Sequence, residues 1–181
     1  TPKGVIFTNE MLCAQLEVFR GGFGLTDNGV DLPLLPIFSL FGLAAGMTSV
    51  MAPLNAAQPL SVNPEAIVQI VMDLSVAHSF GSPTVWGKIA KYCEEQHAVL
   101  PSLAKVYIAG APVSCAAAES VQQVLCNGSL FTPYGATEAL PVTLISADEI
   151  KSILPERAAT GELGTLVGRP VPGVRLQIIA P

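Results

Sequence analysis

The sequence predicts an α/β fold: a parallel sheet flanked by helices, with the start of a small β layer at its C-terminal end. Between about residues 64 and 133, short β-like runs alternate with amphipathic helical segments, which is the pattern of βαβ units. After residue 161 the chain is rich in Gly, Pro and Val and has no helical periodicity. We therefore expect an α/β core over residues 1–160 and the beginning of a β subdomain over 161–181, with the boundary near Pro155–Thr160.

Four expected helices begin after a side chain that can accept a hydrogen bond from the first helical turn. They run from Thr8 or Asn9 to about Arg20, from Asn63 to about Leu74, from Ser82 to about Gln96, and from Ser114 to Asn127. Gly21 and Gly22 are expected to end the first helix, and Pro64 and Pro83 to take the first helical position of the next two. The expected strands cover residues 29–38, 78–81, 105–109 and 130–132.

Composition excludes several classes of protein. Half of the 181 residues are apolar and only 13% are charged, which excludes intrinsic disorder. Nine basic residues against fourteen acidic ones give a net charge of −5, which argues against a nucleic-acid partner. The chain opens on Thr1 and carries no signal-peptide pattern. We expect a segment of a longer cytoplasmic protein, with peripheral membrane association as the alternative.

The stretch from Leu32 to Leu54 contains no charge and is long enough to cross a bilayer. Two features argue against a stable membrane span. Pro33, Pro36 and Pro53 each lack a backbone donor, and no basic residue flanks the stretch to set an orientation. We expect instead a buried strand, a Gly-rich turn and a short helix, because strands of parallel sheets are covered on both faces.

The cysteines and histidines do not form a recognisable site. Cys13, Cys93, Cys115 and Cys126 have no zinc-site spacing and are expected to be buried free thiols. His78 and His97 are expected to be structural. A hydrolase is disfavoured, because the sequence has no G-x-S-x-G elbow and neither histidine has an identifiable nucleophile partner.

Two segments with ligand-binding chemistry follow expected strands. Gly110-Ala111-Pro112 comes after residues 105–109, and Tyr134-Gly135-Ala136-Thr137-Glu138 comes after residues 130–132. If the two strands are neighbours, both segments lie at the carboxyl edge of the sheet, where α/β folds bind ligands. The tyrosine ring suits a planar base, and the hydroxyl and carboxylate suit a Mg²⁺-bound phosphate ester. The alternative is a plain turn followed by a capped helix.

These segments resemble those of the adenylate-forming superfamily, which includes acyl-CoA synthetases, fatty-acyl-AMP ligases and luciferases. Residues 134–138 look like its Y-G-x-T-E motif; by resemblance Tyr134 stacks on adenine, Thr137 contacts the α-phosphate and Glu138 binds Mg²⁺. Gly110-Ala111-Pro112 resembles the adenine-binding G-A-P loop. Thr1–Val5 looks like the end of the phosphate-binding motif, with Lys3 as its lysine. The resemblance implies ATP and Mg²⁺ as cofactors, and Lys3, Thr137 and Glu138 as catalytic residues.

Other segments carry the resemblance along the chain. Residues 36–42 are similar to a P-x-F-H-x-x-G segment near the acyl pocket, which implies that Phe38, Ser39 and Phe41 belong to that pocket. Ser39 stands where acyl-CoA synthetases usually have histidine. Residues 161–164 and 167–170 resemble the G-E-L-G and V-G-x-P segments that follow.

Residues 29–50 and 132–142 resemble most closely the olefin-biosynthesis branch, whose members are β-lactone synthetases. This implies activation of a fatty acid, in particular a 3-hydroxy fatty acid, as acyl-AMP, followed by β-lactone formation. A long-chain fatty acid–CoA ligase, which would also use CoA, is the alternative, and a non-catalytic membrane or interaction module is the alternative of another class. The first half of the phosphate loop and the T-G-D motif are absent, so we expect the 181 residues alone to be inactive. The sequence does not indicate an oligomeric state.

Overall fold

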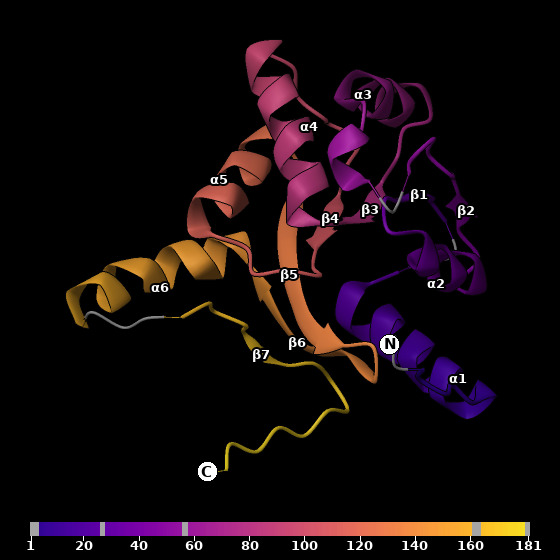
Figure 1. Ribbon diagram of the computed structural model, residues 1–181, viewed down its shortest axis with the longest axis vertical. Helices are drawn as coiled ribbons and strands as arrows, with labels where there is room; N and C mark the ends of the chain where they lie inside the picture. Colours follow the sequence, from indigo (N-terminus) through magenta and orange to yellow (C-terminus); the bar gives the residue numbers. More distant parts are fainter. Residues whose placement is uncertain (1–3, 26–27, 56–57, 161–163, 180–181) are drawn as a thin grey trace.

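A computed structural model describes residues 4–25, 28–55, 58–160 and 164–179. Its centre is a seven-stranded sheet with strand order β2-β1-β3-β4-β5-β6-β7 (Figure 1). The strands are β1 (Val30–Pro33), β2 (Thr48–Ser49), β3 (His78–Gly81), β4 (Lys105–Ile108), β5 (Ser129–Ala136), β6 (Ala139–Ser146) and β7 (Arg169–Pro170). The strands from β2 to β5 are parallel, whereas β6 and β7 are added antiparallel. The predicted α/β class is confirmed, and the antiparallel edge is a feature that the sequence reading lacked.

Helical segments lie on both faces of the sheet. They are α1 (Asn9–Val18), the π-helical turn η1 (Phe19–Phe23), the 3-10 turn η2 (Pro36–Phe38), α2 (Ser39–Ala44), the 3-10 turn η3 (Pro59–Ser61), α3 (Pro64–Asp73), α4 (Pro83–Glu95), α5 (Cys115–Val124) and α6 (Ala147–Thr160). One face is covered by α3 to α6, and the other by η1, η2 and α2 (Figure 1).

The four expected helix starts are confirmed by their hydrogen bonds. The side chains of Thr8, Asn63, Ser82 and Ser114 each accept a hydrogen bond from a backbone N–H of the first turn, at 3.1–3.3 Å. Each bond satisfies a donor that has no partner within the helix. The end of the first helix differs from the prediction. It continues through η1 and stops at Gly24, whose φ of +62° is accessible to glycine at little cost.

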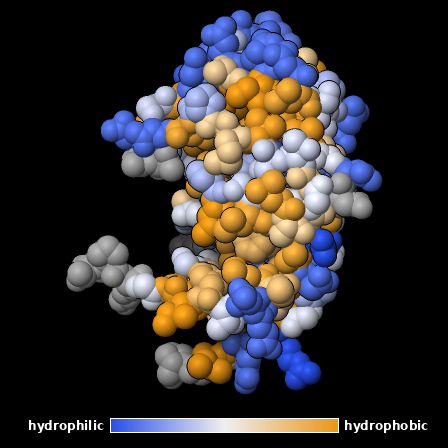
Figure 2. All heavy atoms as spheres, turned by 90° about the vertical axis from the view of Figure 1, so that its right-hand side faces the viewer, coloured by the Kyte–Doolittle hydropathy of each residue, from blue (hydrophilic) through white to orange (hydrophobic). Residues whose placement is uncertain are grey.

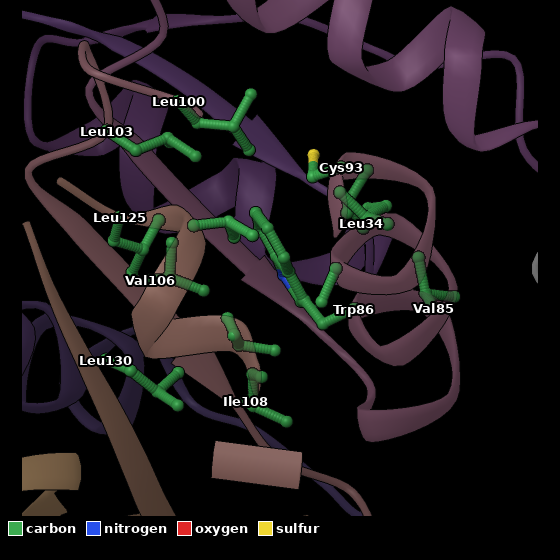
Figure 3. Close-up of a cluster of buried hydrophobic side chains, with 14 of the residues drawn as sticks. Leu34, Val85, Trp86, Cys93, Leu100, Leu103, Val106, Ile108, Leu125 and Leu130 are labelled. Carbon is green, nitrogen blue, oxygen red and sulfur yellow. The ribbon is translucent and has the colours of Figure 1, made fainter. Parts of the chain in front are cut away.

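The main core lies between the sheet and the face covered by α3 to α6. Trp86 of α4 is completely buried there, against strand residues such as Val106, Ile108 and Leu130 (Figure 3). Alternate residues of each strand point to this face, and the others point to the opposite face. The second face therefore receives a separate set of side chains, which form an aromatic cluster.

The charge-free stretch does not form a long helix. Residues 32–54 contain the second half of β1, then η2, the six-residue α2 and the two-residue β2. In the described part of the chain, no helix is both long and apolar enough to cross a membrane. Within this stretch Ile37, Leu40 and Leu43 are each more than half exposed. Figure 2 shows apolar side chains at the surface on the side of the molecule where α2 and β2 lie.

All four cysteines are free, as expected, but only Cys93 is fully buried. Cys13 and Cys126 are exposed and Cys115 is half-buried, so the expectation of buried thiols is wrong for these three. The proposed boundary, Pro155–Thr160, lies in the last part of α6. The β structure that follows begins with β7, which pairs with β6 in the main sheet. A division of the chain at residue 160 stays a prediction.

Candidate functional site

The candidate site lies at the carboxyl ends of four neighbouring parallel strands. β1 is followed by residues 34–38, β3 by Ser82, β4 by residues 109–113 and β5 by the turn at Thr137 and Glu138. Strands β4 and β5 are direct neighbours, with Tyr107 opposite Phe131. The structure therefore brings the segments 110–112 and 134–138 to the same edge of the sheet, which is where parallel α/β folds bind ligands.

The segment Gly110-Ala111-Pro112 is exposed and open. Gly110 has a φ of +92°, a conformation that favours glycine, and a Cβ atom placed there would meet no atom within 4 Å. Just before it, the backbone N–H of Ala109 donates to the carbonyl of Gly81 at 3.1 Å. The start of the loop is thus fixed to β3, while its glycine leaves space for a ligand to approach the backbone.

The segment 134–138 was expected to follow the strand at residues 130–132, and this expectation is wrong for residues 134–136. Strand β5 continues through Tyr134, Gly135 and Ala136 and forms a hairpin with β6, with Thr137 and Glu138 at the turn. The strand continues because residues 139–146 provide an antiparallel partner, in which Pro141, Thr143 and Ile145 are buried and their neighbours are not. The sequence does not show this alternation, because Leu140, Val142 and Leu144 between the buried positions are also apolar.

The hairpin presents its chemical groups to solvent. The Tyr134 side chain is 53% exposed, and Thr137 and Glu138 are exposed at the tip. The register shifts between Tyr134 and Ala136, so the strand is irregular at Gly135. An accessible aromatic face, a hydroxyl and a carboxylate are thereby grouped at one end of the sheet. Lys3, the predicted phosphate-binding lysine, lies outside the described residues, as do residues 161–163.

The three expected acyl-pocket residues lie in and next to an aromatic cluster on the second face of the sheet. Phe38 stacks on Phe80 with ring centroids 3.5 Å apart. The ring centroids of Phe41 and Phe19 are 4.4 Å apart. Ser39 is half-buried and donates its hydroxyl hydrogen to the carbonyl of Pro36 at 2.7 Å, which stabilises the turn before α2. Phe38 and Phe41 also line a cavity of about 20 Å³, enough for about one water molecule.

Two buried polar residues that the sequence did not single out for a role at the site line the same cavity. Asp31 of β1 lies opposite His78 of β3, and the side chains are 6% and 7% exposed. Burial raises the pKa of the Asp31 carboxyl to about 7. Burial, with a smaller contribution from the charge of Lys105, lowers the pKa of His78, and its Nδ1 has no hydrogen-bond partner. The feature of the sequence that could have indicated this role is Asp31 itself, the single charged residue of the expected strand 29–38.

The end of η1 is held to the sheet by two side chains. Lys105 Nζ and the Tyr107 hydroxyl both donate to the carbonyl oxygen of Phe23, at 2.7 and 2.6 Å. Burial lowers the pKa of Lys105. Burial raises the pKa of Tyr107, and the negative charge of Asp31 raises it further. The Phe23 ring also stacks on Tyr107, with centroids 4.4 Å apart. These contacts fix η1, and with it the end of α1, over β4.

No cluster of three or more His, Cys, Asp or Glu side chains that could hold a metal ion occurs among the residues with described positions. The metal ligand that the family resemblance implies is Glu138. A single exposed carboxylate suits Mg²⁺ that is shared with substrate phosphates, because Mg²⁺ keeps several waters and needs few protein ligands.

Residues 1–181 match the family described as "AMP-binding enzyme". The chain is 34% identical over 181 residues to the olefin beta-lactone synthetase of Stenotrophomonas maltophilia, covering 99% of this chain and 32% of that protein. It is 26% identical over 184 residues to a long-chain-fatty-acid–CoA ligase of Thermus thermophilus, covering 98% of this chain and 33% of that protein. It thus spans about a third of the length of the curated relatives it matches.

Solved structures show the same fold. The amide bond synthetase McbA from Marinactinospora thermotolerans aligns with a TM-score of 0.75 at 22% identity, over 95% of this chain and 33% of that one. The O-succinylbenzoate coenzyme A synthetase of Bacillus subtilis, solved in complex with AMP, aligns with a TM-score of 0.67 at 20% identity, over 94% and 32%. On the match over its whole length, the chain belongs to the AMP-binding enzyme family.

Proposed function

We propose that the full-length enzyme activates a fatty acid, in particular a 3-hydroxy fatty acid, with ATP as acyl-AMP and then closes a β-lactone. One observation carries this proposal. The segments 110–112 and 134–138 lie at the ends of neighbouring strands in a chain of the AMP-binding family. The 34% identity to an olefin beta-lactone synthetase supports the choice of second step.

The described residues fit a nucleotide. The half-exposed Tyr134 ring offers a face for adenine, and the open backbone at Gly110, with Ala111 and Pro112, offers a wall on the neighbouring strand. In this proposal Gly135, which has no side chain, lets the base approach the backbone, and Thr137 donates its hydroxyl hydrogen to the α-phosphate. Glu138 binds Mg²⁺, which neutralises phosphate charge when it is bound. Lys3 interacts with the departing phosphates.

The proposed reaction has two steps. A carboxylate oxygen of the fatty acid attacks the α-phosphorus of ATP, a new O–P bond forms and pyrophosphate leaves. The substrate's 3-hydroxyl oxygen then attacks the acyl carbonyl carbon, loses its proton to solvent and displaces AMP. Protein groups catalyse such displacements mainly by positioning the reactants and by stabilising developing charge. We assign that task to Thr137 and Glu138.

The proposed acyl pocket lies beside α2. Phe38 is the last residue of η2, Ser39 and Phe41 belong to α2, and both phenylalanines line the cavity on the second sheet face. Burial of each methylene contributes about 0.8 kcal/mol, so an aromatic-walled pocket favours a fatty substrate. Ser39, in place of the usual histidine of acyl-CoA synthetases, is consistent with a second step that does not use CoA.

The experiment incubates the full-length enzyme with ATP, Mg²⁺ and a 3-hydroxy fatty acid, with and without CoA, and identifies the products by mass spectrometry. The proposal predicts AMP and a β-lactone in the absence of CoA. An acyl-CoA product that forms only when CoA is added would instead establish the ligase alternative. Absence of AMP with every fatty acid tested would overturn the proposal.

A further inference from the structure

Helix α1 contacts the hairpin that carries Thr137 and Glu138. Gln15, which is half-buried on α1, donates a side-chain hydrogen bond to the carbonyl oxygen of Leu140 at 3.1 Å. The two residues are 125 positions apart in the sequence. Leu140 lies two residues after Glu138, so this bond reaches the hairpin next to its tip. In Figure 1, α1 lies beside that end of the β5–β6 hairpin.

The other end of the same helical segment is fixed to the sheet and to α2. Phe23 at the end of η1 accepts hydrogen bonds from Lys105 and Tyr107 of β4. Arg20 donates to the carbonyl of Ala44, the last residue of α2, at 3.0 Å. The helix that carries Gln15 is therefore held by β4 and α2, independently of the hairpin.

The hairpin itself extends beyond the rest of the sheet. Strand β5 pairs with β4 only as far as Phe131, and β6 pairs with β7 only at Thr143 and Leu144. Nearer the tip, Val142 still accepts a hydrogen bond from the Val171 N–H at 3.1 Å, and the ladder of the described strands then joins β5 and β6 to each other. A two-stranded ribbon is marginally stable in water without further packing. The position of its tip therefore depends on contacts such as the one from Gln15.

We infer that Gln15 is a positioning residue for the nucleotide site: its hydrogen bond to Leu140 holds the hairpin tip, and thereby sets where Thr137 and Glu138 lie. The inference rests on the proposed function, because it gives these two side chains their role. Gln15 itself touches neither residue in this account. Its effect passes through the backbone from Leu140 to Glu138.

The test uses the full-length enzyme with Gln15→Glu, which keeps the shape of the side chain but replaces its N–H donor with a carboxylate oxygen. Gln123→Glu adds the same charge at an exposed position of α5 and is the matched control. Loss of one neutral hydrogen bond corresponds to about a fivefold effect. We expect the KM for MgATP to rise by about fivefold or more in Gln15→Glu, while the KM for the fatty acid and both constants of Gln123→Glu stay unchanged.

A second readout does not depend on catalysis. Hydrogen–deuterium exchange of a peptide spanning residues 134–141 is expected to be faster in Gln15→Glu than in the unchanged protein and in Gln123→Glu. Unchanged exchange and an unchanged KM for MgATP would overturn the inference. A KM rise in Gln15→Glu that is equal for ATP and fatty acid would show general loosening of the protein and would also overturn the inference. If the unchanged enzyme forms no acyl-AMP while exchange at the hairpin still rises in Gln15→Glu, the proposed function fails and the Gln15 contact remains as a structural one.

Discussion

Gly135 and Ala139 face each other across the β5–β6 hairpin so closely that no larger residue fits at position 135. A Cβ atom on Gly135 would lie 2.5 Å from the carbonyl oxygen of Ala139 and 2.8 Å from Cδ1 of Leu140. A contact with backbone at this distance cannot be relieved by turning a side chain. The glycine of the tyrosine-containing segment is therefore required by the hairpin itself, in addition to any role beside a ligand.

Gly135→Ala is expected to push β5 and β6 apart and to destabilise the protein by about 1–3 kcal/mol, as overpacking does. The displaced tip would also weaken nucleotide binding in the full-length enzyme. Chemical denaturation measures the first effect, and the KM for MgATP the second.

Gly87→Ala is the matched control, because a Cβ there meets no atom within 4 Å and the residue lies inside α4. Alanine is favoured over glycine in a helix by about 1 kcal/mol, so this variant should be as stable as the unchanged protein or more stable. Equal stability of Gly135→Ala and the unchanged protein would contradict the close approach of the two strands.

Asp31 is expected to make the protein less stable as the pH rises from 4 to 8. Its pKa is raised from 3.8 to about 7, so in this range the folded state holds a proton that the unfolded state has lost. Ionisation of the buried carboxylate then costs roughly 4 kcal/mol above pH 7, since one pKa unit is about 1.4 kcal/mol. Asp31→Asn should raise the melting temperature at pH 8 and have little effect near pH 4.

His78 acts with the opposite sign. Its pKa is lowered in the folded state, so its contribution is complete above pH 6.5 and is lost as the pH falls below that value. His78→Gln in the Asp31→Asn background isolates the contribution of His78 to the pH dependence of stability.

For Asp31→Asn the control is Asp73→Asn, which removes a carboxylate at an exposed site. A melting temperature of Asp31→Asn that tracks the unchanged protein at every pH would show that Asp31 is not buried as described.

Ser146 and Glu149 form a reciprocal cap at the start of α6. The Ser146 hydroxyl accepts from the Glu149 N–H at 3.2 Å, and the Glu149 carboxylate accepts from the Ser146 N–H at 2.9 Å. The hydrogen bonds that the Glu149 carboxylate accepts from the Ser146 N–H and from the Ser146 hydroxyl lower the pKa of Glu149. Ser146→Ala should cost about 1 kcal/mol in denaturant unfolding. Ser152→Ala, within the same helix, should cost less, and an equal cost would argue against a specific cap.

The sequence predicted structural features that depend on residues close together in the chain. Asn63 and Ser114 were identified as helix caps because a capping residue acts on the turn that follows it. The spacing Ser146 to Glu149 is a signal of the same kind, and it could have predicted α6. By contrast, the Gln15–Leu140 contact joins residues from opposite ends of the chain, and no periodicity indicates it.

The candidate site was predicted in outline for the same reason. The alternation of strands and helices placed Gly110 and Tyr134 after expected strands but left open whether those strands are neighbours. The continuation of β5 through Tyr134 to Ala136 depended on a partner strand that was overlooked. The pairing of Asp31 with His78 depends on strand register, which the sequence of one strand does not determine.

The most direct test of the account is ATP–pyrophosphate exchange by the full-length enzyme with Glu138→Gln, with Glu94→Gln at an exposed position of α4 as the control. Removing one group that stabilises transition-state charge typically costs about 100-fold or more in rate. The account predicts a loss of that size for Glu138→Gln at unchanged melting temperature, and normal exchange for Glu94→Gln. Exchange by Glu138→Gln at the rate of the unchanged enzyme would contradict the assignment of the hairpin tip to the nucleotide site.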